Sequence, residues 1–124
     1  HSEFGAFSFT FEVNQSFQPD YSVREPTLQK HRKAWSYFIQ RATQNLLSLK
    51  VVSSARNAPL EATVTIAGVS GNSGEKPFRT NPNGNFFKIL DPGVYNVQVQ
   101  LADGRVKKFQ VEMKGQPQGQ LVQF

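Results

Sequence analysis

The sequence predicts a mainly β fold, a seven-stranded β-sandwich preceded by one strand and one amphipathic α-helix. The region from residue 48 onward contains seven short strand-like runs, each followed or preceded by turn residues. Apolar and polar residues alternate clearly in 62–66 and 94–101, as they do in strands with one buried face. Asp103-Gly104 lies between two alternating runs and is typical of a tight hairpin turn.

The turn residues between these runs set the expected strand limits. Gly84, in an Asn-Pro-Asn-Gly stretch, and Gly93, in an Asp-Pro-Gly stretch, are suited to turn conformations with positive φ. Tyr95 is expected to bury its ring while its hydroxyl reaches a loop. The seven expected strands are Leu49–Ser53, Glu61–Ile66, Lys76–Thr80, Asn85–Leu90, Val94–Leu101, Arg105–Glu112 and Gly119–Phe124.

The first part of the chain has a different residue pattern. Phe7, Phe9 and Phe11 alternate with polar residues, which predicts a strand with one apolar face. A helix is predicted over Pro26–Leu47, because Pro suits the first helical turn and apolar residues recur at helical spacing. Its expected apolar face comprises Leu28, Trp35, Phe38, Ile39, Ala42 and Leu46.

We therefore divide the chain into residues 1–47 and residues 48–124. One strand and one helix bury too little apolar surface to be stable by themselves. Their apolar faces are expected to need a further sheet, so 1–47 is interpreted as an incomplete part of another domain.

Composition excludes several classes of function. The chain has no Cys, so it contains no disulfide, no thiolate nucleophile and no Cys-ligated metal. Its only His residues are His1 and His31, and their spacing does not preset two imidazoles as metal ligands. No apolar run is long enough to span a membrane. The net charge of +5 favours anionic partners in general, but a solvated surface is the preferred explanation.

Residues 48–124 resemble the carboxypeptidase regulatory-like domains, which have the transthyretin-like (prealbumin-like) fold. The pattern consists of a Pro-Leu entry to an alternating strand, an Asn-Gly turn before an aromatic strand, and a Leu-x-Pro-Gly-x-Tyr corner. The residues that carry it are Pro59, Leu60, Asn83, Gly84, Phe86, Leu90, Pro92, Gly93 and Tyr95. The resemblance implies a fold and leaves the function open, because such domains occur in peptidases, adhesins and receptors.

Residues 1–47 resemble the end of the catalytic domain in carboxypeptidase A-like zinc peptidases. The matching segments are Gly5–Glu12, the Phe17-Gln18-Pro19 stretch, and the amphipathic helix with Trp35. Carried over by position, Glu12 would be the catalytic general base, and Thr10 would line the substrate pocket on the same strand face. Spacing alone would make Glu12 an ordinary exposed residue on an edge strand.

This second resemblance implies a zinc carboxypeptidase that removes C-terminal residues from peptides, with the sandwich aiding folding or positioning. The parent enzyme would hold the zinc through residues upstream, so this chain alone is expected to bind no metal and to be inactive. Its expected partners are the upstream catalytic domain and a peptide substrate, with no nucleic acid and no membrane. A secreted or periplasmic location is expected.

Two alternatives remain at this point. The chain could be a non-enzymatic β-sandwich module for binding or adhesion, with exposed strand edges as its contact surface. The helix could also pair with a second copy through its exposed apolar face. Nucleic-acid binding through Lys107, Lys108 and Lys114 is disfavoured, because these residues are those of an ordinary surface strand.

Overall fold

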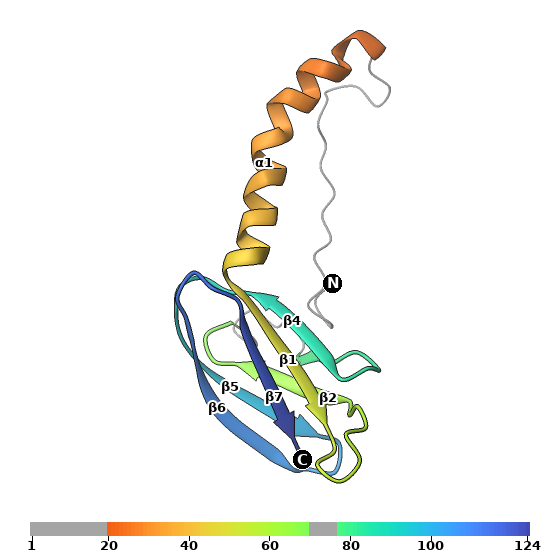
Figure 1. Ribbon diagram of the computed structural model, residues 1–124, viewed down its shortest axis with the longest axis vertical. Coiled ribbons are helices and arrows are strands. Elements are labelled where there is room, and N and C mark those ends of the chain that lie inside the picture. Colours follow the sequence, from red (N-terminus) through yellow and green to blue (C-terminus); the bar gives the residue numbers. More distant parts are fainter. Residues whose placement is uncertain (1–19, 70–76) are drawn as a thin grey trace.

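The computed structural model describes residues 20–69 and 77–124, and these residues form a long helix and a two-layer β-sandwich (Figure 1). A short 3-10 turn, η1 (Tyr21–Val23), leads into helix α1 (Arg24–Gln44), which projects from one end of the sandwich. The strands are β1 (Leu46–Val52), β2 (Ala62–Ile66), β3 (Phe78–Arg79), β4 (Asn85–Ile89), β5 (Gly93–Leu101), β6 (Val106–Met113) and β7 (Gln118–Gln123).

The seven strands of the described residues divide into two sheets. One has the order β4-β1-β7, in which β1 is antiparallel to β4 and parallel to β7. The other has the order β3-β2-β5-β6 and is antiparallel throughout. The edge strands are therefore β4 and β7 in the first sheet, and β3 and β6 in the second.

The core lies between the two sheets and follows from period-two alternation. From β1, Leu47, Leu49 and Val51 point inward and are at most 2% exposed. They belong to one cluster with inward-facing residues of the second sheet, including Val64 and Val99. Burial of these branched and aromatic side chains provides the main favourable term for folding.

The turn before β4 is held by local hydrogen bonds. The Asn81 side-chain oxygen accepts from the backbone N–H groups of Asn83 (3.1 Å) and Asn85 (3.0 Å). Gly84 has φ +72°, a conformation that glycine adopts at little cost. The expected positive φ at Gly84 is thus confirmed. The expected contact of the Tyr95 hydroxyl with a loop is also confirmed, because this hydroxyl donates a hydrogen bond to the Asp91 carbonyl at 3.0 Å.

The mainly β fold with seven strands in two sheets, preceded by a helix, is confirmed. The predicted strand centred on Phe7–Phe11 lies outside the described residues, as does the start of the run expected from Lys76. The predicted end of the helix is wrong: α1 ends at Gln44, and Leu46 and Leu47 begin β1. The side chain of Leu47 is completely buried in the sandwich, and this burial favours strand geometry over one further helical turn.

Candidate interaction surfaces

The two residues to which sequence analysis assigned roles in catalysis, Thr10 and Glu12, lie outside the described residues. Their roles as pocket residue and general base stay predictions. Within 20–69 and 77–124, no group of three His, Cys, Asp or Glu side chains is arranged to hold a metal ion. No helix in these same ranges is long and apolar enough to cross a membrane. Three surfaces of the described residues combine exposed apolar or charged side chains and are described in turn.

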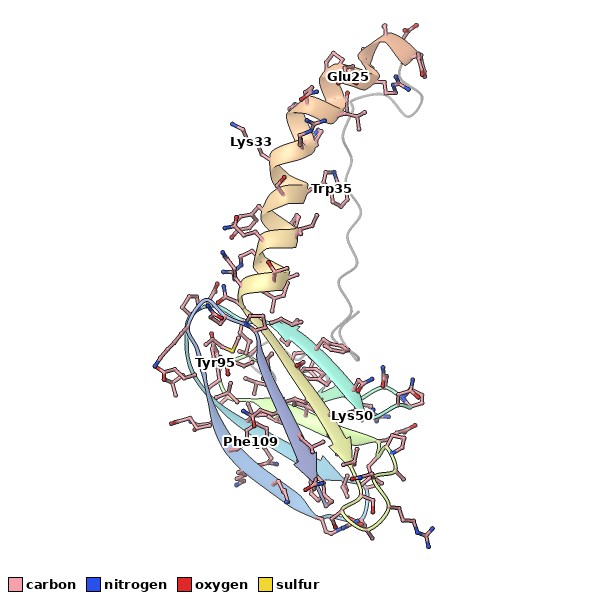
Figure 2. The ribbon with its side chains drawn as sticks, viewed as in Figure 1. Glu25, Lys33, Trp35, Lys50, Tyr95 and Phe109 are labelled. Carbon is pink, nitrogen blue, oxygen red and sulfur yellow. The ribbon has the colours of Figure 1, made fainter. Side chains whose placement is uncertain are left out.

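The first surface is the apolar side of α1. Within Arg24–Gln44 no residue is buried. Leu28 is 54% exposed, Trp35 55% and Ile39 66%, although these side chains are large and apolar. Lys33 and Trp35 project from opposite sides of the helix, in line with its amphipathic pattern (Figure 2). The helix therefore carries an apolar surface that the sandwich does not cover.

The helix is nevertheless attached to the sandwich at its C-terminal end. The Arg41 guanidinium forms an ion pair with the Asp91 carboxylate, in the turn between β4 and β5. Asn45, the one residue between α1 and β1, accepts a backbone hydrogen bond from Leu90 at 3.1 Å. Since the Asp91 carbonyl also accepts from Tyr95, one turn of the sandwich is joined both to the helix and to β5.

The outer face of the β4-β1-β7 sheet is a second apolar surface. The strand register pairs Leu46 with Ile89 and Ser48 with Phe87, on the face opposite the core. Phe87 is 40% exposed, and Leu121 of β7 is 61% exposed. Several apolar side chains on one outer face are typical of a contact surface rather than of a fully solvated one.

The third surface is a groove of about 450 Å³ between the edge strands β6 and β7. These strands belong to different sheets and approach each other along one side of the sandwich (Figure 1). The groove is lined by Val106, Lys107, Lys108, Phe109, Gln120, Leu121, Val122 and Gln123. Basic and amide side chains therefore line its walls, with Phe109 and Val122 contributing apolar contacts.

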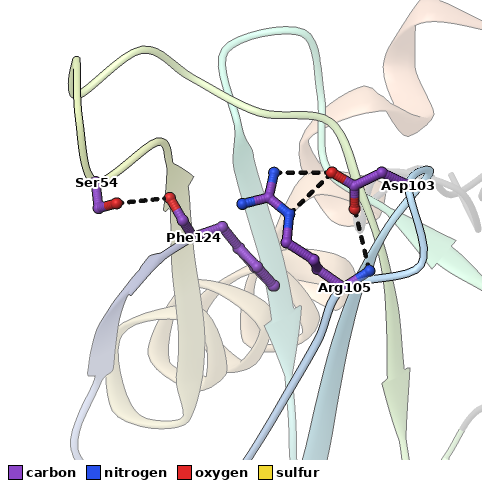
Figure 3. A network of polar contacts seen from close by, with 4 residues as sticks. All are labelled: Ser54, Asp103, Arg105 and Phe124. Atoms are coloured by element: carbon purple, nitrogen blue, oxygen red, sulfur yellow. Dashed lines mark hydrogen bonds and ion pairs between the residues drawn. The ribbon is translucent and has the colours of Figure 1, made fainter.

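One end of this groove is fixed by hydrogen bonds around Phe124 and Arg105 (Figure 3). The Phe124 carbonyl accepts from the Ser54 backbone N–H (2.7 Å) and the Ser54 hydroxyl (2.9 Å). Asp103 accepts from the Arg105 backbone N–H (3.0 Å) and from its Nε (2.9 Å). These hydrogen bonds with Arg105 lower the pKa of the Asp103 carboxyl below its ordinary value.

Two cations lie against the Phe124 ring. The Arg105 guanidinium carbon and the Lys107 Nζ are each 5.7 Å from the ring centroid, within the range of cation–π contacts. By sequence, Lys107 and Lys108 are ordinary residues of a surface strand, and the groove is not predicted. The only sequence signal for the groove is the Lys107-Lys108 pair. The opposite wall, β7, is placed by its long-range pairing with β1, which no local pattern indicates.

Comparison with known proteins does not assign the chain to a family. No protein-family model matches it, and no curated protein matches it. Three solved structures are similar to parts of it at low sequence identity. One is a type II cohesin–X–dockerin complex from Acetivibrio cellulolyticus, with 21% identity and a TM-score of 0.45. The match covers 63% of this chain and 52% of the other.

The other two are the major pilin subunit of Bacillus cereus and a DUF3823 family protein from Bacteroides uniformis. The pilin has 15% identity and a TM-score of 0.42, over 66% of this chain and 29% of the pilin chain. The DUF3823 protein has 17% identity and a TM-score of 0.33, over 65% of this chain and 42% of its own. The chain thus spans about half or less of each of these structures. At these TM-scores the similarities support no statement about function.

Proposed function

We propose that this chain is the C-terminal part of a secreted or periplasmic zinc carboxypeptidase, in which the β-sandwich is an accessory to the catalytic domain. The residue pattern of Gly5–Glu12 and the resemblance of 48–124 to carboxypeptidase regulatory-like domains suggest this assignment. The exposed apolar surface of α1 is the structural observation that supports it most directly. In this proposal the catalytic domain covers Leu28 and Ile39, which the sandwich leaves exposed.

The attachment of α1 to the sandwich gives the accessory role a physical basis. The helix would dock on the catalytic domain, while Arg41–Asp91 and Asn45–Leu90 hold its last turn against the sandwich. With only Asn45 between α1 and β1, docking of the helix would also position the sandwich. The described residues offer no set of zinc ligands, so the metal would be held by residues of the catalytic domain.

The catalytic contribution proposed for this chain is Glu12, with Thr10 lining the substrate pocket. The test uses the complete gene product that contains this chain, assayed for zinc content and for release of C-terminal amino acids from peptides. Replacing Glu12→Gln is expected to lower kcat by about 10²- to 10⁴-fold while the zinc content is unchanged. The matched control is Glu61→Gln, at an exposed position of the sandwich, which is expected to leave kcat unchanged.

Two results would contradict the peptidase. One is a complete gene product that binds no zinc, and the other is an E12Q variant that hydrolyses peptides as fast as the unmodified protein. In either case the second candidate, a non-enzymatic binding module, would account better for the chain. That candidate is favoured by one observation, the groove between the edge strands β6 and β7.

A further inference from the structure

The β6–β7 groove combines two features, unpaired strand edges and uncompensated positive charge. Within the described residues, β6 pairs only with β5, and β7 pairs only with β1. The side of each strand that faces the groove thus has no neighbouring strand among these residues. Such edges present backbone N–H and C=O groups that can pair with an added extended segment.

The charges along this groove are almost entirely positive. Arg105 directly precedes β6, and Lys107 and Lys108 lie in its first three residues. Asp103 forms an ion pair with Arg105. Neither Lys107 nor Lys108 forms an ion pair with any of the described residues. The two lysines therefore leave a net positive charge that an anionic ligand would neutralise.

Lys107 has an unusual position on its strand. The register pairs it with the buried Val99, so it lies on the same face of β6 as Phe109 and Val111, whose side chains pack in or against the core. A lysine that points inward at a sheet edge discourages pairing with a neutral or basic strand, because its charge would be desolvated without a partner. An acidic strand would supply that partner. The same lysine would thus select for acidic segments and against others.

We infer that the β6–β7 groove binds an extended acidic peptide segment. Carboxylates on one face of the segment pair with Lys107, while Lys108 interacts with carboxylates on its other face. The backbone of the segment pairs with the exposed edge of β6. A peptide fits better than a nucleic acid, because the Phe109 and Phe124 rings pack against the core rather than standing free for base stacking. This inference does not depend on the proposed peptidase.

The experiment titrates the 124-residue chain with an octapeptide of repeating Glu-Glu-Val-Val, which carries carboxylates on both faces when extended, at low and at high salt. Amide shifts in an NMR spectrum are expected along β6 and β7, with affinity that falls as salt rises. A double variant, Lys107→Gln with Lys108→Gln, is expected to weaken binding about tenfold or more. The matched control also removes two charges, Lys33→Gln with Lys114→Gln, because Lys33 lies on α1 and Lys114 is paired with Glu112, and neither lines the groove; its effect should stay below about twofold.

Four results would overturn the inference. The first is absence of peptide-induced shifts, and the second is shifts confined to the other edge strands, β3 and β4. The third is equal weakening by the groove variant and by the control variant, each of which removes two charges, because this would indicate attraction by net charge only. The fourth is tighter binding of a single-stranded oligonucleotide than of the peptide, which would favour nucleic acid. Because Lys107 and Lys108 are exposed, the double variant is expected to fold. Unchanged NMR amide positions outside the groove will verify this.

Discussion

Gly84 lies directly against the backbone of Val51, and this contact leaves no room for a side chain. A Cβ atom at Gly84 would overlap the Val51 carbonyl oxygen and press on the backbone of Leu60. The Gly84 carbonyl in turn accepts a hydrogen bond from the Val51 N–H at 2.8 Å. The turn before β4 is thereby held close to the central strand of its sheet, β1.

We expect the change Gly84→Ala to destabilise the sandwich strongly. The positive φ alone costs about 1–3 kcal/mol for a residue with a Cβ, and the overlap with Val51 adds to this cost. Gly104 is a matched control, since its φ is also positive (+89°) but nothing lies within 4 Å of a Cβ placed there. Chemical unfolding should show a loss for Gly84→Ala that exceeds the loss for Gly104→Ala by at least about 2 kcal/mol. Equal losses would contradict the close approach of Gly84 to β1.

The pKa of Asp103 should reveal its interaction with Arg105. The hydrogen bonds from Arg105 lower this pKa below the ordinary value of 3.8. Carboxyl titration by NMR should therefore find Asp103 still ionised where a free aspartate is half protonated. The change Arg105→Gln should raise the pKa of Asp103 toward its ordinary value. The pKa of Asp20, which is lowered by hydrogen bonds from Ser22, should not change in that variant.

The lowered pKa of Asp103 makes the folding stability depend on pH. Because the folded-state pKa of Asp103 is depressed, its contribution to stability is present above the unfolded value of about 3.8 and is lost as pH falls through the lower folded value. The carboxyl is exposed to solvent, which screens its interactions, so this contribution is small. A pKa of Asp103 that is insensitive to Arg105→Gln would show that the ion pair is absent in solution.

Under the peptidase proposal, the exposed apolar surface of α1 predicts a contrast between the isolated chain and a complete gene product that contains it. Ile39 is 66% exposed, so Ile39→Lys should leave the unfolding free energy of the 124-residue chain unchanged. In the complete gene product the same change should cost about 2 kcal/mol, because it removes a buried branched side chain from the docked interface. Gln40→Lys adds the same charge at a neighbouring exposed position and should have little effect in both proteins.

The occupant of this surface can be identified by measuring mass in solution. If light scattering finds the isolated chain to be a dimer that Ile39→Lys converts to a monomer, a second copy covers the helix. If Ile39→Lys and Gln40→Lys have equal effects in the complete gene product, the catalytic domain does not cover Ile39. The second result would remove the main structural support for the peptidase proposal.

The strands of the sandwich were predictable because their signals are local. The alternation of apolar and polar residues in 62–66 and 94–101 indicates which side chains face the core. Gly-containing turns separate one strand from the next. All seven strands accordingly lie close to the predicted positions. The helix was predictable for the same reason, since its periodicity is a property of neighbouring residues.

The end of the helix depended on distant residues. Leu46 and Leu47 fit the helical spacing, but Leu47 is completely buried against strands that follow it in the chain, and the core stabilises it as part of β1. Local periodicity contains no information about that burial. The sequence therefore determined that a helix leads into a sandwich, and the tertiary structure determined where one becomes the other.

The β6–β7 groove is likewise a product of tertiary structure. It depends on the parallel pairing of β1 with β7, strands about seventy residues apart in the sequence, for which no local pattern exists. The sequence by itself determined the strands, the turns and an excess of positive charge. The packing of the two sheets decided that Arg105 and Lys107 both contact the Phe124 ring, beside two exposed strand edges. These residues are distant in the sequence from Phe124, so the contacts form only when the chain folds.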